Sequence, residues 1–203
     1  AVGFTNIGSI YEKQGNYDKA LDYQIQSLKL EEELGDKEGI ASSLDNVGTI
    51  YKIQGDYTKA MEYLTEALKM REELADKRGV ASSLIDIGGV YSDRGDYDQA
   101  LKYGKRSLDI AKEIGLTIEI KNAARLLWEI NKKLGRHEPA LEMHELYISS
   151  RDSLESEENQ KEVIRQEYKY SYEKQAAADS VKTAEATKVK NALLTAERVK
   201  NKQ

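Results

Sequence analysis

The fold is decided by residues 44–61, LDNVGTIYKIQGDYTKAM, because the same pattern of residues returns at a constant spacing. Forty residues earlier the chain reads FTNIGSIYEKQGNYDKAL, and forty residues later it reads LIDIGGVYSDRGDYDQAL. A weaker copy, ARLLWEINKKLGRHEPAL, covers residues 124–141. Self-similarity at a fixed spacing of about 20–50 residues is typical of repeat arrays. The sequence therefore predicts one structural unit that occurs four times.

Each copy predicts two helices joined by a tight turn. Apolar residues step by three and four, as at Leu44, Val47 and Ile50, which is the period of an α-helix and not of a strand. Gly55 can adopt the left-handed conformation that ends a helix, and the Asp56 carboxylate can accept from free backbone N–H groups at the start of the next one. The same punctuation recurs at residues 15–16, 35–36 and 95–96, and as Ala-Asp at 75–76. Each unit is thus expected to be an antiparallel helical hairpin.

Glycine stands in the middle of the first helix of three units, at Gly8, Gly48 and Gly88. Such a glycine costs about 0.5–1 kcal/mol relative to alanine, so its return needs a compensating gain. Alanine recurs on the second helix, at Ala20, Ala60 and Ala100. Small residues on both helices would let the two backbones approach closely, and overpacking such a contact would cost about 1–3 kcal/mol. We predict a close helix contact at these positions.

The pattern resembles the tetratricopeptide repeat, whose signature of a large apolar residue, Leu-Gly, Tyr and later Ala is matched by Phe4, Ile7, Gly8, Tyr11 and Ala20. Its spacing exceeds the usual period of about 34 residues and is similar to the longer-helix variety in kinesin light chains and spindle-orientation adaptors. The resemblance implies an all-α fold, a right-handed superhelix of four stacked antiparallel hairpins over residues 1–154. The first hairpin is expected to be truncated and the fourth degenerate. A long C-terminal helix over residues 155–203 would follow.

The fourth unit departs from the others. Trp128 occupies the place of Gly8, and Ala124 occupies that of Phe4, so large and small residues have exchanged places four residues apart on one helical face. Pro139 falls in the first turn of the second helix, where proline is tolerated. We expect an atypical unit with altered helix pairing, near the end of the array.

The segment from residue 156 onward contains neither proline nor glycine and favours helix throughout. A weak apolar stripe shifts phase along it. The stripe comprises Val163, Tyr170, Ala177 and Ala184, then Ala186, Val189, Leu193 and Ala196. We expect a solvated helix or linker whose first turns cap the array. The stretches 168–170 and 173–182 also resemble segments that join repeat sensors to a membrane helix in Bacteroidetes-type signalling proteins.

Composition excludes several functions. The chain of 203 residues is 39% hydrophobic and has no cysteine, so we expect a sizeable core without disulfides or thiolate metal sites. No apolar run approaches the roughly 20 residues that a membrane-spanning helix needs. Residues 1–154 hold 21 Lys and Arg against 27 Asp and Glu, and this acidic balance argues against binding to phosphate backbones. We therefore expect neither nucleic-acid binding nor membrane contact by this segment.

No pattern in the sequence indicates catalysis. His137 and His144 lie seven residues apart, whereas metal ligands on one helix normally lie three or four apart, so we expect both to be packing residues. Acidic runs such as residues 31–33 lie at predicted helix ends, where a solvated surface is favoured over acid–base chemistry. There is no phosphate-binding glycine loop. The prediction is a protein that is not an enzyme and needs no cofactor or metal.

In the resembling family, the first helix of each unit lines a concave groove, and residues beside the apolar stripe face a partner. The predicted groove residues are Asn6, Ser9, Lys13, Asp45, Asn46, Thr49, Lys52, Asp86, Asp93, Arg125, Glu129 and Lys132. An asparagine amide can both donate to and accept from a peptide backbone, and asparagine recurs at 6 and 46, although Asp86 and Leu126 end the series. The surface becomes more basic toward unit four.

These observations predict a protein-interaction module that binds a peptide or protein segment in its concave groove, within a larger bacterial signalling protein. The chain opens with Ala-Val-Gly and the repeat is already under way there, so we expect an excised piece of a longer protein. The alternative is a structural module that forms a homodimer through the array and the C-terminal helix. The sequence indicates no compartment; a periplasmic and a cytoplasmic part of a membrane-tethered protein both fit the resemblance.

Overall fold

The structure, a computed structural model, describes the backbone of residues 1–200, and beyond residue 162 it describes only some of the side chains. It divides into two compact units, Ala1–Leu154 and Glu155–Gln203. The helices are α1 (Val2–Lys13), α2 (Tyr17–Leu34), α3 (Lys37–Ile53), α4 (Tyr57–Glu73), α5 (Lys77–Asp93), α6 (Tyr97–Glu113), α7 (Thr117–Lys133) and α8 (His137–Lys200). None of the helices in the described residues is long and apolar enough to cross a membrane.

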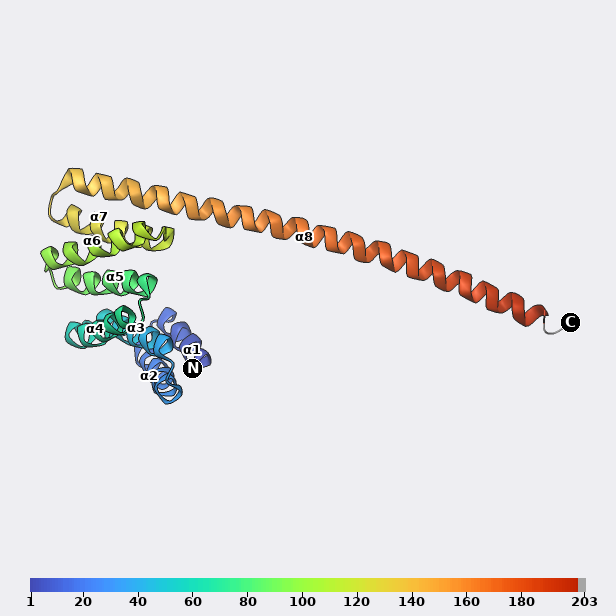
Figure 1. The fold of residues 1–203 in the computed structure, drawn as a ribbon, viewed down its shortest axis with the longest axis horizontal. Coiled ribbons are helices and arrows are strands. Elements are labelled where there is room, and N and C mark those ends of the chain that lie inside the picture. Colours follow the sequence, from blue (N-terminus) through green and yellow to red (C-terminus); the bar gives the residue numbers. More distant parts are fainter. Residues whose placement is uncertain (201–203) are drawn as a thin grey trace. The chain divides into compact units, whose positions relative to one another are not determined.

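The first unit is an array of antiparallel helical hairpins, which confirms the predicted all-α repeat fold (Figure 1). Helices pair as α1 with α2, α3 with α4 and α5 with α6, and each second helix also packs on the first helix of the next hairpin. Because every helix contacts the helices before and after it in sequence, the core is continuous along the array. Helix α1 has 12 residues, where α3, α5 and α7 have 17 each, so the first hairpin has a shortened first helix.

The helix boundaries follow the predicted punctuation. Gly15, Gly55 and Gly95 have φ angles of 74°, 81° and 81°, in the left-handed region after the first helix of each hairpin. In each case the side chain of the next residue accepts a hydrogen bond from a backbone N–H group and caps the following helix. These capping residues are Asn16, Asp56 and Asp96. Both parts of the prediction are thereby confirmed.

Between hairpins, the turn at residues 75–76 lacks glycine but keeps the same geometry. Ala75 has a φ angle of 54°, and it is the one non-glycine residue with positive φ in the described backbone. Asp76 still caps α5, because its Oδ1 accepts from the Gly79 backbone N–H at 2.9 Å. The alanine therefore carries a conformational cost that glycine would not.

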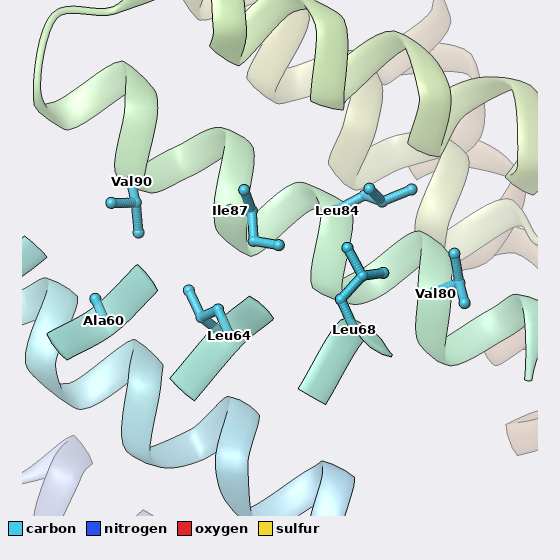
Figure 2. Close-up of a cluster of buried hydrophobic side chains, with 7 residues drawn as sticks. All are labelled: Ala60, Leu64, Leu68, Val80, Leu84, Ile87 and Val90. Carbon is cyan, nitrogen blue, oxygen red and sulfur yellow. The ribbon is translucent and has the colours of Figure 1, made fainter. Parts of the chain in front are cut away.

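The core between the second and third hairpins consists of interdigitated apolar side chains from α4 and α5 (Figure 2). Leu64 on α4 and Leu84 and Ile87 on α5 are fully buried. The predicted close contact lies beside them: a Cβ on Gly48 would lie 2.7 Å from Leu64 Cγ and 3.2 Å from the Ala60 carbonyl oxygen. At Gly8 the near neighbour is instead the side chain of Gln24, at 2.8 Å.

The fourth hairpin replaces the glycine contact with aromatic stacking. Trp128 packs on His144, with ring centroids 4.3 Å apart, and on Tyr147 at 6.0 Å. Ala124, which takes the place of a larger residue, is fully buried. His144 is therefore a packing residue, whereas His137 is exposed at the start of α8.

The described side chains of the second unit are exposed, among them Ile164 and Tyr172. Local contacts link residues three or four apart, such as Arg165 with Glu162 at 3.1 Å. The predicted apolar stripe of Val163, Tyr170, Ala177, Ala184, Ala186, Val189, Leu193 and Ala196 lies outside the side chains that the structure describes. Its role as a cap, linker or dimer contact stays a prediction.

Candidate functional site

The candidate site is the face formed by the first helices of the hairpins, here called the inner face. Helix α5 contacts both α3 and α7, whereas the described contacts include none of comparable extent between α4 and either α2 or α6. In a stack of hairpins, the layer whose helices approach more closely forms the shorter and therefore concave side. The predicted groove residues all belong to this layer.

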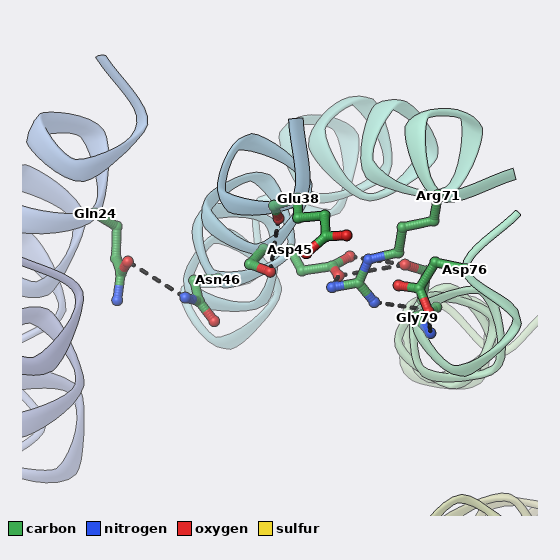
Figure 3. A network of polar contacts seen from close by, with 9 residues as sticks. Gln24, Glu38, Asp45, Asn46, Arg71, Asp76 and Gly79 are labelled. Carbon is green, nitrogen blue, oxygen red and sulfur yellow. Dashed lines mark hydrogen bonds and ion pairs between the residues drawn. The ribbon is translucent and has the colours of Figure 1, made fainter. Parts of the chain in front are cut away.

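One of the predicted groove residues, Asp45, lies in the interior. It is only 8% exposed, and its Oδ2 pairs with Arg71 Nη2 on α4 at 2.6 Å (Figure 3). Ser83 on α5 donates to Asp45 Oδ1 at 3.0 Å. A buried carboxylate requires ionic and hydrogen-bonding partners, and Asp45 finds them on α4 and α5. The carboxylate thus joins three helices of two adjacent hairpins. We assign it to the contact between hairpins and no longer to the ligand-facing set.

Arg71 is held by a second contact, which explains a glycine at the start of α5. Its Nη1 donates to the Gly79 carbonyl oxygen at 2.7 Å. A Cβ on Gly79 would lie 2.5 Å from Arg71 Cδ, so a side chain there would displace the arginine. The glycine therefore makes room for the guanidinium of Arg71, which reaches Asp45 behind it.

Asn46, beside Asp45 on α3, does face the boundary between the first two hairpins. Its Nδ2 donates to Gln24 Oε1 at 3.3 Å (Figure 3). Gln24 is fully buried on α2, and its own Nε2 donates to the Thr5 carbonyl oxygen on α1. This chain of amides fixes the side chain of Asn46, and it uses one of the two donors that an asparagine amide carries.

Lys52, Asp86 and Gly89 come together where α3 meets α5. Lys52 Nζ lies 3.3 Å from the position that a Cβ on Gly89 would occupy. Burial raises the pKa of the Asp86 carboxyl, and the nearby charges of Lys52 and Arg71 lower it in part. The sequence analysis placed Lys52 and Asp86 on this face, and the structure brings them together with Gly89.

The two aspartates of this region influence each other. Burial raises the pKa of Asp45 to about 7, the Arg71 charge opposes the shift, and the negative charge of Asp86 adds to it. A carboxyl that is desolvated beside a like charge takes up a proton more readily than it does in water. The centre of the inner face therefore rests on a buried polar layer whose charge changes near neutral pH.

The other predicted groove residues differ in exposure. Ser9 and Thr49 are half-buried, and Ser9 Oγ donates to the Thr5 carbonyl oxygen of its own helix at 3.0 Å. The exposed ones are Asn6, Lys13, Asp93, Arg125, Glu129 and Lys132. Lys132 Nζ lies 6.0 Å from the Trp128 ring centroid. Exposure leaves these side chains accessible to a ligand, and their role in binding stays a prediction.

Sequence reasoning missed Gln24, Arg71 and Ser83, which position the predicted residues from behind. A signal was present at two of these positions. Position 24 corresponds to Leu64 and Gly104 forty and eighty residues later, and Arg71 corresponds to Glu31 and Ala111. A position whose chemistry changes from unit to unit does not serve the shared packing of the repeat.

The described residues contain no group of three or more His, Cys, Asp or Glu side chains arranged to hold a metal ion. The polar cluster of the inner face instead consists of one ion pair within the second hairpin and hydrogen bonds that join adjacent hairpins. The expectation that the protein needs no cofactor and performs no catalysis stays a prediction.

Comparisons with solved structures support the same fold. The chain is similar to BtubC (BKLC) from P. vanneervenii, with 22% identity, a TM-score of 0.65, and coverage of 75% of this chain and 63% of that one. Aspartyl phosphate phosphatase F from Bacillus subtilis shares 20% identity at a TM-score of 0.69, over 74% and 40% of the two chains. A Rap protein complexed with Competence and Sporulation Factor shares 19% identity at a TM-score of 0.70, over 76% and 43%.

The chain spans less than two thirds of the length of each of these three structures. At such identities the likeness shows the fold alone. No curated protein matches the chain. The sequence model described as tetratricopeptide repeat matches residues 1–73 and 79–153, which is most of the chain and nearly all of the first unit. The chain therefore belongs to the tetratricopeptide repeat family, and it is a protein-interaction module.

Proposed function

We propose that the inner face binds an extended segment of another protein, and the cluster at the centre of that face is the observation that carries this proposal. Gly89 presents no side chain, and the neighbour above it is the flexible end of Lys52, so a ligand backbone can approach α5 closely there when that end withdraws. Lys52 and Asp86 beside it offer opposite charges at the boundary of two hairpins. A floor without a side chain, flanked by charged groups, suits a polypeptide backbone better than a compact small molecule.

Asn46 extends this cluster toward the first hairpin. Its contact with Gln24 holds the amide in one orientation before any ligand arrives. A fixed amide loses less conformational freedom on binding than a mobile side chain, which costs about 0.5–1.5 kcal/mol to immobilise. Asn46 is therefore suited to pair with a backbone N–H or C=O group of the bound segment.

Charge along the inner face sets the expected polarity of the ligand. Helix α7 exposes Arg125 and Lys132, with Glu129 between them, whereas α5 exposes Asp93 and contributes Asp86. Complementary charges favour correct orientation and fast association. We propose that acidic residues of the bound segment lie over α7 and basic ones over the end of α5.

The test begins with a random peptide library that is displayed on phage and selected against the folded array. Affinities of the selected peptides are then measured by calorimetry for the wild type and for Asn46→Ala combined with Lys132→Glu. We expect the double variant to bind at least about tenfold more weakly, which corresponds to roughly 1.4 kcal/mol. Lys69→Glu, an exposed change on the outer helix α4, is the matched control and should leave affinity unchanged.

Circular dichroism establishes that each variant keeps the fold. If the folded double variant binds the selected peptides as tightly as the wild type does, the inner face is not the binding site. If the control variant weakens binding equally, the selected peptides respond to overall charge and the proposed groove is also wrong.

The alternative is self-association through the array and the C-terminal helix, and its test can use the exposed side of α1. Ile7 and Ile10 on α1 are 38% and 54% exposed, although Val47 and Ile50, forty residues later, are fully buried. The reason is that α2 covers α3, whereas no described helix covers the same side of α1. Light scattering over a range of protein concentrations tests this alternative: a dimer that Ile10→Lys dissociates supports it, and a monomer at all concentrations refutes it.

The similar Rap protein was solved in a complex with a factor, which supports a role in binding a protein or peptide partner. The proposed place of this chain within a larger signalling protein goes further. It rests on the resemblance of the C-terminal segment, and the sequence of the parent gene tests it.

A further inference from the structure

Three hairpins share a stacked pair of tyrosines that the fourth lacks. The pairs are Tyr11 with Tyr23, Tyr51 with Tyr63, and Tyr91 with Tyr103, with ring centroids 5.5, 5.6 and 5.4 Å apart. The third pair packs against the core between α4 and α5. In the fourth hairpin the same two positions hold Asn131 and Met143. Two large rings are therefore replaced by smaller or more flexible side chains at the junction of the third and fourth hairpins.

A cavity of about 360 Å³ lies at this junction, within the first unit. Its apolar wall comes from Leu108, Leu127 and Met143, and the nearly fully buried Asn131 adds one polar side chain. Asn131 Nδ2 donates to the Leu127 carbonyl oxygen at 2.8 Å, which fixes the amide in the wall. This volume falls in the range of about 300–1,000 Å³ that is usual for small-molecule sites.

Neighbouring residues explain why the space is not filled from within. The Trp128 ring lies 4.3 Å from the His144 ring, and Trp128 precedes Asn131 by three residues, so the aromatic contact of this hairpin lies about one helical turn earlier on α7. On α6, Gly104 stands where α4 has Leu64. A Cβ on Gly104 would lie 2.9 Å from Leu127 Cδ2, so a larger residue cannot enter without moving that leucine.

The rim of this cavity has the opposite charge to the preceding junction. Lys105, Lys112 and Arg136 line it, together with one carboxylate, Glu142. The corresponding positions forty residues earlier are Thr65, Glu72, Asp96 and Lys102. The four positions thus change from a net charge of −1 to a net charge of +2, although residues 1–154 as a whole are acidic. Cations that surround an apolar pocket favour an anion with an apolar body.

We propose that this junction cavity binds a small organic acid that has a flat apolar ring and one carboxylate. The ring takes the space that a tyrosine ring occupies in the preceding junctions, against Leu108, Leu127 and Met143. The carboxylate faces the cations of the rim, Lys105, Lys112 and Arg136. This site is separate from the inner face, so it can exist whether or not that face binds a peptide.

The experiment uses 4-hydroxyphenylacetate, whose phenol ring equals a tyrosine side chain. Methyl resonances of Leu108, Leu127 and Met143 are followed by NMR as the acid is added to the full chain. We expect saturable shifts at these methyl groups. The neutral ring 4-methylphenol should bind roughly fivefold more weakly, because one favourable charge contact at a partly exposed site is worth up to about 1 kcal/mol.

Two variants locate the site. Asn131→Tyr restores the residue of the preceding hairpins, fills the cavity and should abolish the saturable shifts. Lys112→Glu leaves the cavity open and should weaken the acid roughly fivefold without affecting 4-methylphenol, a result that does not depend on how Asn131→Tyr packs. Lys102→Glu is the matched control, since it makes the same charge reversal on α6 outside the cavity lining, and it should change affinity less than twofold.

Three outcomes would overturn the proposal. The first is the absence of saturable shifts at the three methyl groups when the acid reaches millimolar concentration. The second is equal affinity for the acid and for 4-methylphenol, because the cations would then contribute nothing. The third is shifts that survive in Asn131→Tyr while its circular dichroism spectrum and thermal transition match the wild type, which would place the acid elsewhere.

Discussion

Replacing Gly48 with alanine should destabilise the array, although alanine is the better helix former. A Cβ at this position would lie 2.7 Å from Leu64 Cγ and 3.2 Å from the Ala60 carbonyl oxygen, whereas ordinary contacts begin at about 3.4 Å. Leu64 is fully buried and the second neighbour is backbone, so neither can move aside without shifting the helix. The substitution therefore forces α3 and α4 apart.

The magnitude follows from two opposing effects. Overpacking of a tight core contact costs about 1–3 kcal/mol. The change from glycine to alanine in a helix interior recovers about 1 kcal/mol. The net loss of unfolding free energy should reach about 2 kcal/mol at the upper end of the range.

Gly89 supplies the matched control, because it also lies in the interior of a first helix, and its added Cβ would meet only the end of the Lys52 side chain at 3.3 Å. That side chain is flexible and can withdraw. Gly89→Ala should therefore gain most of the helix propensity and stabilise the array by about 0.5–1 kcal/mol. The two substitutions have the same chemistry and opposite expected signs.

Urea denaturation followed by circular dichroism measures both free energies, and the slope of the transition shows whether the array unfolds as one unit. Thermal midpoints should shift in opposite directions, by about 2–4 °C for each kcal/mol. If Gly48→Ala stabilises the protein as much as Gly89→Ala does, the helices do not approach closely at Gly48, and the explanation of the recurring glycine is wrong.

Three further predictions concern single residues. The folded-state pKa of Asp45, about 7, exceeds its ordinary value of 3.8, so the stability that this carboxyl contributes is complete below pH 4 and is lost as pH rises to 7. In urea titrations, the difference in unfolding free energy between wild type and Asp45→Asn should fall by about 4 kcal/mol over that interval. A difference that does not change with pH contradicts this prediction. Ala75→Gly should stabilise the protein by up to about 1 kcal/mol in the same assay, because the φ angle of 54° suits glycine; a loss of stability would contradict the strain. Ile10 is 54% exposed, so Ile10→Lys should change the unfolding free energy by less than about 0.5 kcal/mol. Ile50 is fully buried, so Ile50→Lys should cost more than about 4 kcal/mol. Equal effects would argue against the described packing.

The scaffold was predictable from the sequence because every unit must solve the same packing problem. A glycine followed by a capping residue recurs at a constant spacing, with the glycines at positions 15, 55 and 95. The structure shows the left-handed turns and the helix caps that this pattern implies. Helix periodicity and turn chemistry act over a few residues, so they can be recognised without knowledge of tertiary contacts.

The candidate site was only partly predictable, because exposure depends on what a side chain meets across the boundary between hairpins. Asp45 and Asn46 are neighbours on α3, and periodicity placed both beside the apolar stripe. The structure turns Asp45 toward Arg71 and Ser83, and it leaves Asn46 half-buried against Gln24. These partners lie between 22 and 38 residues away in sequence, and no local pattern indicates them.

In a repeat array, the positions that differ between units carry more information about function than those that recur. Positions that recur from unit to unit are fixed by packing, as the stacked tyrosines of three hairpins illustrate. Where a unit departs from this pattern, the departure either has a compensating partner or leaves a feature that packing does not explain. The exchange at Trp128 is compensated by His144. The exchange at Asn131 leaves a cavity whose rim also changes charge, so two independent departures coincide at one place, and a ligand site accounts for both.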